Sequence, residues 1–237
     1  MMHLYNRKAQ TRAESPLWTD ITRPLWPLGM NYFKMRAHRY DVSRLQNDLS
    51  IAIQAGTWVE KDKPGNWKSI TLKGYKGQEQ DFLTRTHLGT GINNNYEYTS
   101  VMDNCSYFKQ ILDEMPTDVY LVRVLRLGPR SRIKFHTDEV VFRKREEIIR
   151  CHIPIITHPD VKFQIGYPLN APAEGYQVWN AYELGSRYLE AGYLYYTNVN
   201  TLHGVVNDSD IERYHLCIDF RPPPHIVKVV QSSLEKN

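Results

Sequence analysis

From residue 118 onward, hydrophobic and polar positions alternate in a series of short segments. Segment 119–127, VYLVRVLRL, alternates and is rich in β-branched residues, which is typical of a strand with one buried face. Further segments of this kind follow: RIKFHTD, EEIIRCHIPII, VKFQIGY, AGYLYYTNV, HGVVN and RYHLCIDF. Gly, Pro, Asn and Asp separate them, and no long helical pattern intervenes. Short strands in this arrangement predict a β-sandwich or jelly roll, so the fold class is mainly β.

The first half of the chain shows a different pattern. A helix is predicted to begin at Asp41 or Ser43, since either side chain can cap a helix N-terminus. A second helix is predicted from Ser106, its cap, to Pro116, which ends it. Segment 61–80 contains Pro and several Gly residues, which predicts loops with at most short strands. The apolar residues at helical spacing are Leu45, Leu49 and Ile53 in the first helix, and Phe108, Ile111, Leu112 and Met115 in the second.

These patterns divide the chain into three parts. Residues 1–117 are predicted to form an N-terminal extension of helices and loops that packs on the core. Residues 118–222 form the β core, because the prolines at 222–224 cannot continue a central strand. Residues 223–237 are left as a C-terminal tail.

Composition excludes several classes of protein. The chain of 237 residues is 41% hydrophobic and 24% charged, which is ordinary for a globular protein. No apolar run approaches the roughly 18 residues of a membrane span, and the N-terminus lacks the apolar segment of a secretory signal. A net charge of +4 is too small an excess to indicate a nucleic-acid partner. Cys105, Cys151 and Cys217 form neither a zinc motif nor a disulfide framework, so we expect buried free thiols and a cytoplasmic location.

A metal site is predicted around the motif His136-Thr137-Asp138, which ends the segment RIKFHTD. Residues two apart in a strand point to the same side, so His136 and Asp138 can meet one ion. His203 begins a later strand and supplies a third ligand. Two histidines and one carboxylate, with open positions remaining, form the facial triad of non-haem Fe(II) oxygenases. The same ligands would also hold Mn, Co, Ni or Zn.

A second His-x-Asp motif, His158-Pro159-Asp160, competes with the first. Pro159 holds His158 in an extended conformation and then favours a turn. We therefore predict a loop between two strands there, and the strand-end setting favours His136 and Asp138 as the ligands.

Arg213 lies ten residues after His203, across the predicted turn 207–210. A β-hairpin would return Arg213 beside His203 if its loop has an odd length or contains a bulge, whereas a two-residue turn would place Tyr214 there. Its guanidinium could then grip the far carboxylate of a dicarboxylic cosubstrate. The alternative is a surface arginine paired with Asp208, Asp210 or Glu212.

Arg150 and His152 alternate with apolar residues in EEIIRCHIPII, so they face one side of a strand. They either line the same pocket or belong to a polar outer face. His215 shares a face with Arg213, which favours a supporting or structural role for it.

The stretches IKFHTD, IIRCHIPI and NTLHGVVNDSDIERYHLCIDF resemble the aspartyl/asparaginyl β-hydroxylase family of Fe(II)/2-oxoglutarate dioxygenases. The resemblance covers residues 119–221 and combines His-x-Asp, Arg-x-His-Ile-Pro, a His with an Arg ten residues later, and a closing His-Leu-x-x-Asp. It implies a double-stranded β-helix, cupin-like core, with Fe(II), 2-oxoglutarate and O₂. It also implies the roles of the residues: iron ligands His136, Asp138 and His203, distal-carboxylate ligand Arg213, and Arg150 and His152 in the cosubstrate and substrate pocket.

Family members differ at one of these positions. Some vertebrate-type members have Gly where this chain has Asp138, so the chain resembles the bacterial branch, which includes enzymes similar to free-proline hydroxylases. Nothing in the N-terminal third matches the peptide-binding repeat domain of the vertebrate proteins. The resemblance thus implies hydroxylation of a C–H bond in a free amino acid or in an amino-acid residue of a protein, with release of succinate and CO₂.

Two other classes of function stay open. A non-catalytic, cupin-like small-molecule binding module would explain the strands and some histidines, but not Arg213. A structural or interaction protein would use the histidines as core or surface residues. Motif and strand context together favour the hydroxylase.

Overall fold

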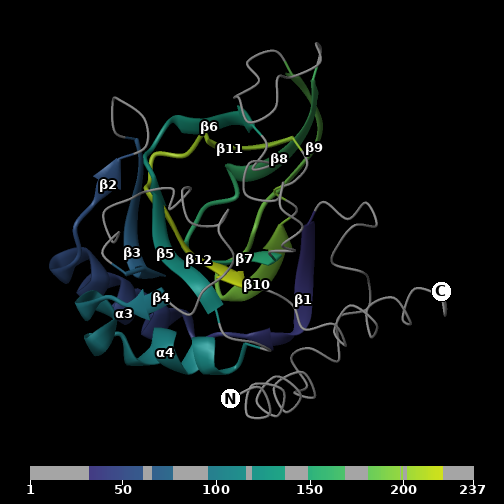
Figure 1. Ribbon diagram of the computed structural model, residues 1–237. Helices are drawn as coiled ribbons and strands as arrows, with labels where there is room; N and C mark the ends of the chain where they lie inside the picture. The colour runs from purple at the N-terminus through teal and green to yellow at the C-terminus, as the bar shows by residue number, and fades with distance from the viewer. Residues whose placement is uncertain are drawn as a thin grey trace.

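Two antiparallel β-sheets lie face to face in the computed structural model, which describes residues 32–60, 66–76, 96–115, 119–136, 149–168, 181–197, 199 and 202–220. Figure 1 shows the smaller sheet above the larger one. The strands of the core are β5 (Val119–Leu127), β6 (Ser131–His136), β7 (Ile149–Ile156), β8 (Val161–Pro168), β9 (Ala181–Arg187), β10 (Tyr193–Thr197), β11 (His203–Asn207) and β12 (Arg213–Phe220).

The chain passes back and forth between the sheets as it runs from β5 to β12. Strands β10, β7, β12 and β5 are neighbours in the larger sheet, and the smaller sheet has the order β6-β11-β8-β9. Among these described strands, β8 and β9 are the one consecutive pair that stays in the same sheet. This path is a double-stranded β-helix, so the predicted mainly β, jelly-roll core is confirmed.

The connection between β11 and β12 is a corner between the sheets, and the predicted β-hairpin is wrong. β11 pairs with β6 and β8, whereas β12 pairs with β5 and β7. Buried Asn207 fixes the corner: its side-chain amide donates to the carbonyls of Gly128 at 2.8 Å and Ile211 at 2.9 Å, and its Oδ1 accepts from the Ser209 N–H at 3.1 Å. These bonds tie the corner to the β5–β6 connection. Arg213 therefore starts a strand that lies across the barrel from β11.

The N-terminal part contributes both helices and strands. Helices α3 and α4 lie against the outer face of the larger sheet (Figure 1), where their apolar residues share one core cluster with β5, β7 and β12. Strand β3 pairs with β5, β1 with β10, and β2 and β4 with β3. The elements are β1 (Tyr32–Arg39), α3 (Val42–Ala55), β2 (Val59–Glu60), β3 (Trp67–Tyr75), β4 (Tyr96–Tyr98), the 3₁₀-helix η1 (Ser100–Asn104) and α4 (Ser106–Asp113).

The two predicted helices are confirmed, but one predicted cap is wrong. Asp41 caps α3, accepting hydrogen bonds from two backbone N–H groups of the first turn. Ser106 lies inside α4 rather than at its cap, and the α4 N-terminus is capped from the other helix. Buried Asp48 of α3 accepts from the N–H groups of Tyr107 at 2.8 Å and Phe108 at 2.9 Å. A tertiary contact thus supplies the acceptor that a local side chain was expected to supply.

Strand β3 corrects the prediction of loops with at most short strands in segment 61–80. It has 9 residues and pairs along β5 from Trp67 to Lys73. Ile70 and Leu72 lie in the outer core with the helices, and Trp67 lies in the inner core between the sheets. Both faces of β3 are therefore covered. This burial beside β5 stabilises a strand in a segment whose glycines had predicted loops.

Two hydrophobic clusters stabilise the described structure. The outer cluster fills the space between the helices and the larger sheet, and the inner cluster joins the two sheets. Cys105, Cys151 and Cys217 are buried free thiols, as predicted. Among the described helices, none has the length and apolar character needed to cross a bilayer. Predictions for residues 1–31, Pro116, Asp138 and the tail 223–237 lie outside the described residues.

Candidate active site

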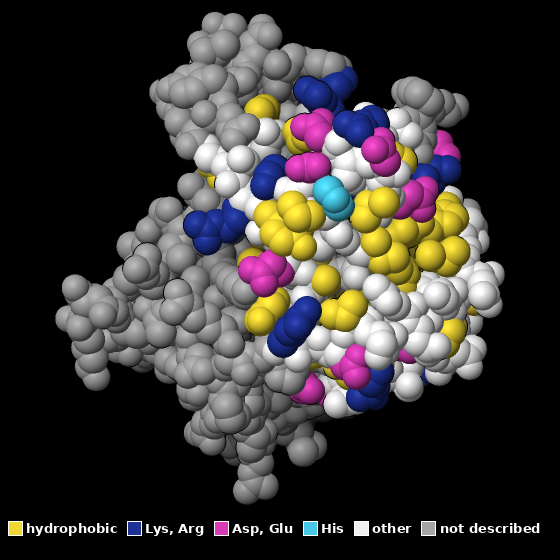
Figure 2. All heavy atoms as spheres, turned by 180° about the vertical axis from the view of Figure 1, so that it is seen from behind, with side chains coloured by type: hydrophobic (Ala, Val, Ile, Leu, Met, Phe, Trp, Pro, Cys, Tyr) yellow, Lys and Arg dark blue, Asp and Glu magenta, His cyan; other side chains and the backbone are white. Residues whose placement is uncertain are grey.

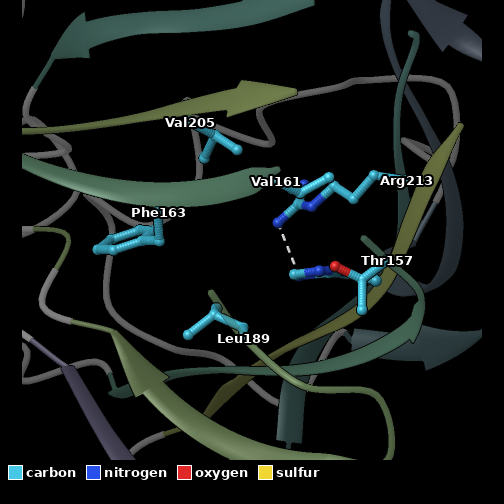
Figure 3. Close-up of a pocket in the computed structure, with 7 residues that line it drawn as sticks. Thr157, Val161, Phe163, Leu189, Val205 and Arg213 are labelled. Carbon is cyan, nitrogen blue, oxygen red and sulfur yellow. Dashed lines mark hydrogen bonds between the residues drawn. The ribbon is translucent and has the colours of Figure 1, made fainter. Parts of the chain in front are cut away.

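The predicted site residues of β12 lie on the inner face of the larger sheet, toward the smaller sheet. Arg213 and His215 line a pocket together with Phe163 of β8 and Val205 of β11, as Figure 3 shows. Alternate residues of a strand share a face, so the row continues through Cys217 toward the end of β12. The remaining wall residues of this pocket are Thr157, Val161 and Leu189.

His136 and His203 lie opposite each other on β6 and β11 in the smaller sheet. Both are buried, and their ring centroids are 4.3 Å apart. The ring of Phe163 stacks on His203 at 5.8 Å, and Trp67 approaches His136 at 6.0 Å. The structure therefore brings together the two predicted histidine ligands, at the side of the barrel that faces the polar row of β12.

The orientation of His136 suits a metal ligand. Its Nδ1 lies 2.8 Å from the carbonyl oxygen of Lys134, which can only accept a hydrogen bond. Nδ1 therefore carries a proton, and Nε2 is the ring nitrogen that would coordinate an ion. Asp138 follows two residues later, outside the described residues, and the described residues contain no group of three potential ligands.

Arg213 is buried, with 2% of its surface exposed. Its Nη2 donates to Nδ1 of His215 at 2.6 Å, drawn as a dashed line in Figure 3. Its Nε and Nη1 have no hydrogen-bond partner among the described residues. Burial lowers the pKa of Arg213 to about 9, so the side chain is still a cation at neutral pH.

The alternative of a surface arginine at position 213 is wrong. Two other arginines take the nearby acids: Arg126 pairs with Glu212, and Arg130 forms two hydrogen bonds to Asp210 at 2.8 and 2.9 Å. On the face in Figure 2, acidic and basic side chains are likewise interspersed over the described surface. Arg213 differs from these surface arginines because it is a buried cation that faces a pocket.

Arg150 and His152 of β7 lie on the inner face, so the alternative of a polar outer face does not apply to them. Arg150 forms two hydrogen bonds to the carboxylate of Asp219, at 2.7 and 2.8 Å. His152 is buried, and its ring lies 5.6 Å from that of His215. In the part of the chain that the structure describes, its Nδ1 has no hydrogen-bond partner. Burial and the nearby Arg213 lower the pKa of His152 well below its ordinary value, so it is neutral.

Comparison with known families shows the family to which the chain belongs. The model of the family described as aspartyl/asparaginyl β-hydroxylase matches residues 33–223. The chain belongs to this family. The protein is accordingly an oxidoreductase of the hydroxylase type, and the resemblance seen in residues 119–221 is confirmed over a longer range.

Several solved structures are similar to the hydroxylase at low identity. An oxidoreductase of the 2OG-Fe(II) oxygenase family from Burkholderia pseudomallei is 12% identical, with 81% of this chain and 85% of that chain covered and a TM-score of 0.48. The non-heme alpha ketoglutarate dependent epimerase SnoN from nogalamycin biosynthesis is 11% identical, with 86% and 80% covered and a TM-score of 0.47. A cupin domain from Bordetella pertussis is 20% identical, with 42% and 78% covered and a TM-score of 0.27. The comparison with curated proteins found no match.

The structure adds residues that sequence reasoning missed. Arg123 of β5 lies in register with Cys217, and its Nη2 is 3.7 Å from Asp219, so this acid of the hydroxylase contacts two arginines. The alternation of VYLVRVLRL already puts Arg123 on one face of β5 with three leucines. Ser69 and Thr71 of β3 are buried, and no described residue forms a hydrogen bond with their hydroxyls. These hydroxyls were missed because segment 61–80 was predicted as loops.

Proposed function

We propose that the hydroxylase is an Fe(II)/2-oxoglutarate-dependent dioxygenase that hydroxylates a C–H bond of an amino acid or of an amino-acid residue in a protein. The observation that carries the proposal is Arg213, a buried cation that faces a pocket inside the barrel. Within the described residues its guanidinium makes one hydrogen bond, to a neutral histidine. Such a group is costly unless an anion joins it. The two carboxylates of 2-oxoglutarate suit a site with one metal and one deep arginine.

The donor set of this chain fits ferrous iron. His136 and His203 are adjacent across two strands, and the hydrogen bond from Nδ1 of His136 to the Lys134 carbonyl orients its ring. We propose that Asp138 completes the set, since two imidazoles and one carboxylate leave positions for cosubstrate and oxygen. Fe(II), when bound, supplies the activation of O₂ that puts one oxygen atom into the substrate C–H bond and converts 2-oxoglutarate into succinate and CO₂.

The other site residues bind, orient and exclude water. We propose that the planar fork of Arg213 holds the distal carboxylate of 2-oxoglutarate. His152, neutral and with its Nδ1 unpaired, is suited to a hydrogen bond with the cosubstrate, and Arg150 is fixed beside it by Asp219. The apolar side chains of Phe163 and Val205 exclude water from the pocket, which protects a reactive oxidant.

The test combines cosubstrate binding with turnover. Anaerobic addition of Fe(II) and 2-oxoglutarate should give a weak visible charge-transfer band. With O₂, succinate should form in a screen over the twenty amino acids and over peptides containing Asp or Asn, with a product 16 mass units heavier than its substrate. Absence of the band and of succinate would overturn the proposal. Binding of 2-oxoglutarate without succinate release under any condition would favour the non-catalytic binding module.

A further inference from the structure

The partner of Arg213 is unusual for a buried arginine. Buried charges are normally paired with an opposite charge, as Arg150 is with Asp219 in the same sheet. The residue beside Arg213 on the inner face of β12 is instead His215. Within the described part of the chain, Arg213 forms no ion pair.

His215 is a neutral acceptor in this pair. An imidazole nitrogen that accepts a hydrogen bond carries no proton, so Nδ1 is bare and the proton lies on Nε2. Burial and the nearby Arg213 lower the pKa of His215 well below its ordinary value, in agreement with this state. The Arg213–His215 pair therefore keeps a full positive charge, whereas the Arg150–Asp219 pair carries none.

His215 is itself fixed by its surroundings. It is 1% exposed, and it lies opposite Leu125 of β5 and Pro154 of β7 in the sheet register. The ring of His152 meets it edge-on at 5.6 Å. A side chain held this firmly can restrain the one that it contacts.

We propose that His215 is a positioning residue that fixes the Arg213 guanidinium in the pocket without neutralising it. The inference rests on the proposed function, in which Arg213 binds the distal carboxylate of 2-oxoglutarate. A guanidinium has five N–H groups; His215 takes one, and Nε and Nη1 have no partner. A carboxylate at position 215 would occupy the fork and cancel its charge. An apolar residue there would let the Arg213 side chain adopt several conformations before the ligand binds, and binding would then have to order it.

The test uses two keto acids with the same chelating end. 2-Oxoglutarate carries a distal carboxylate and 2-oxobutyrate does not. The dissociation constant of 2-oxobutyrate divided by that of 2-oxoglutarate therefore reports recognition at Arg213 alone. Both constants are measured by calorimetry on the Fe(II)-loaded protein without O₂, for wild type and for His215→Asn, His215→Leu and His215→Asp. Circular dichroism checks the fold of each variant. His158→Asn, at an exposed loop histidine, is the matched control and should keep the wild-type ratio.

The variants have distinct expected results. His215→Asn keeps a neutral acceptor and should keep the ratio within about threefold of wild type. His215→Leu should lower the ratio roughly 10-fold, the effect of one hydrogen bond to a charged group. His215→Asp should lower it further, roughly 100-fold, because the new carboxylate competes for the fork. Asn and Asp have nearly the same size, so this pair carries the test even if the Leu variant does not fold.

Two results would overturn the inference. One is a wild-type ratio in both the Leu and Asp variants. The other is an equal loss of affinity for both keto acids in every variant, since a purely structural role would weaken the whole site. A wild-type protein that binds neither keto acid would instead overturn the proposed function, and the inference with it.

Discussion

Replacement of Arg213 by Met should weaken 2-oxoglutarate binding and, at the same time, stabilise the free protein. Met keeps much of the side-chain length and removes the charge. In the structure Arg213 is 2% exposed and has one hydrogen bond, to neutral His215. A buried cation without a carboxylate is a cost to folding that only the ligand removes.

Both effects have a magnitude that follows from this geometry. Truncating one partner of a buried, hydrogen-bonded charge pair costs about 2–5 kcal/mol, which raises the dissociation constant of 2-oxoglutarate roughly 30- to 5,000-fold. In the ligand-free protein, removing the buried charge raises the free energy of unfolding by several kcal/mol. About 1–3 kcal/mol of this is lost again, because His215 no longer has its hydrogen-bond donor. A net gain of about 1 kcal/mol should raise the Tm by about 2–4 °C for a chain of this size.

Thermal unfolding of the Fe(II)-loaded protein without O₂, across a 2-oxoglutarate titration, measures both quantities. Wild type should gain Tm steeply with 2-oxoglutarate, and Arg213→Met should start higher and gain little. Arg130→Met is the matched control, because Arg130 is an exposed arginine paired with Asp210. It should change neither quantity appreciably. Wild-type affinity in Arg213→Met, or a Tm several degrees below wild type, would refute the reasoning.

Three further predictions concern the metal, the buried ion pair and the thiols. His136→Ala and His203→Ala should each lose bound iron by elemental analysis and release no succinate; normal succinate release would contradict the ligand assignment. Asp219→Ala should destabilise the protein by about 3–5 kcal/mol in urea unfolding, since buried Arg123 and partly buried Arg150 lose their carboxylate; an Asp219→Ala, Arg150→Met double variant should recover part of this, and no recovery would contradict the pairing. Burial raises the pKa of the Cys217 thiol to about 11 from 9.0, so its contribution to stability is present below about pH 9 and is lost as the pH rises toward 11. The three buried thiols should also resist alkylation at pH 8, and rapid labelling of the folded protein would refute their burial.

Sequence patterns predict this fold where the determining interaction is local. Alternation in VYLVRVLRL and RYHLCIDF predicts strands because side chains in a strand alternate between two faces. It also predicts that Arg213 and His215 share a face, and the 2.6 Å hydrogen bond between them confirms this. Asp41 precedes a helical pattern and caps it, which again needs only neighbouring residues.

Features that depend on distant residues could not be predicted in this way. The corner after β11 depends on Asn207 reaching Gly128 and Ile211, so the loop sequence alone resembled a hairpin. Strand β9 passed unnoticed because its place is fixed by pairing with β8. The cap of α4 comes from Asp48, more than fifty residues earlier in the chain.

The larger sheet can hold a charged site because its outer face is apolar and packs under the helices, while its inner face bears the charged side chains. On β12, Leu216 and Ile218 point outward into the core under the helices, while Arg213 and Asp219 alternate with them on the inner face. Fully burying each outward side chain contributes about 1.5–3 kcal/mol, and the same strand bears the cost of a buried, unneutralised guanidinium. The helices are therefore part of what stabilises the barrel. By covering the outer face, they stabilise the sheet enough for its inner face to hold a cation ready for an anionic ligand, and this is why we expect the loss of Arg213 to cost binding rather than folding.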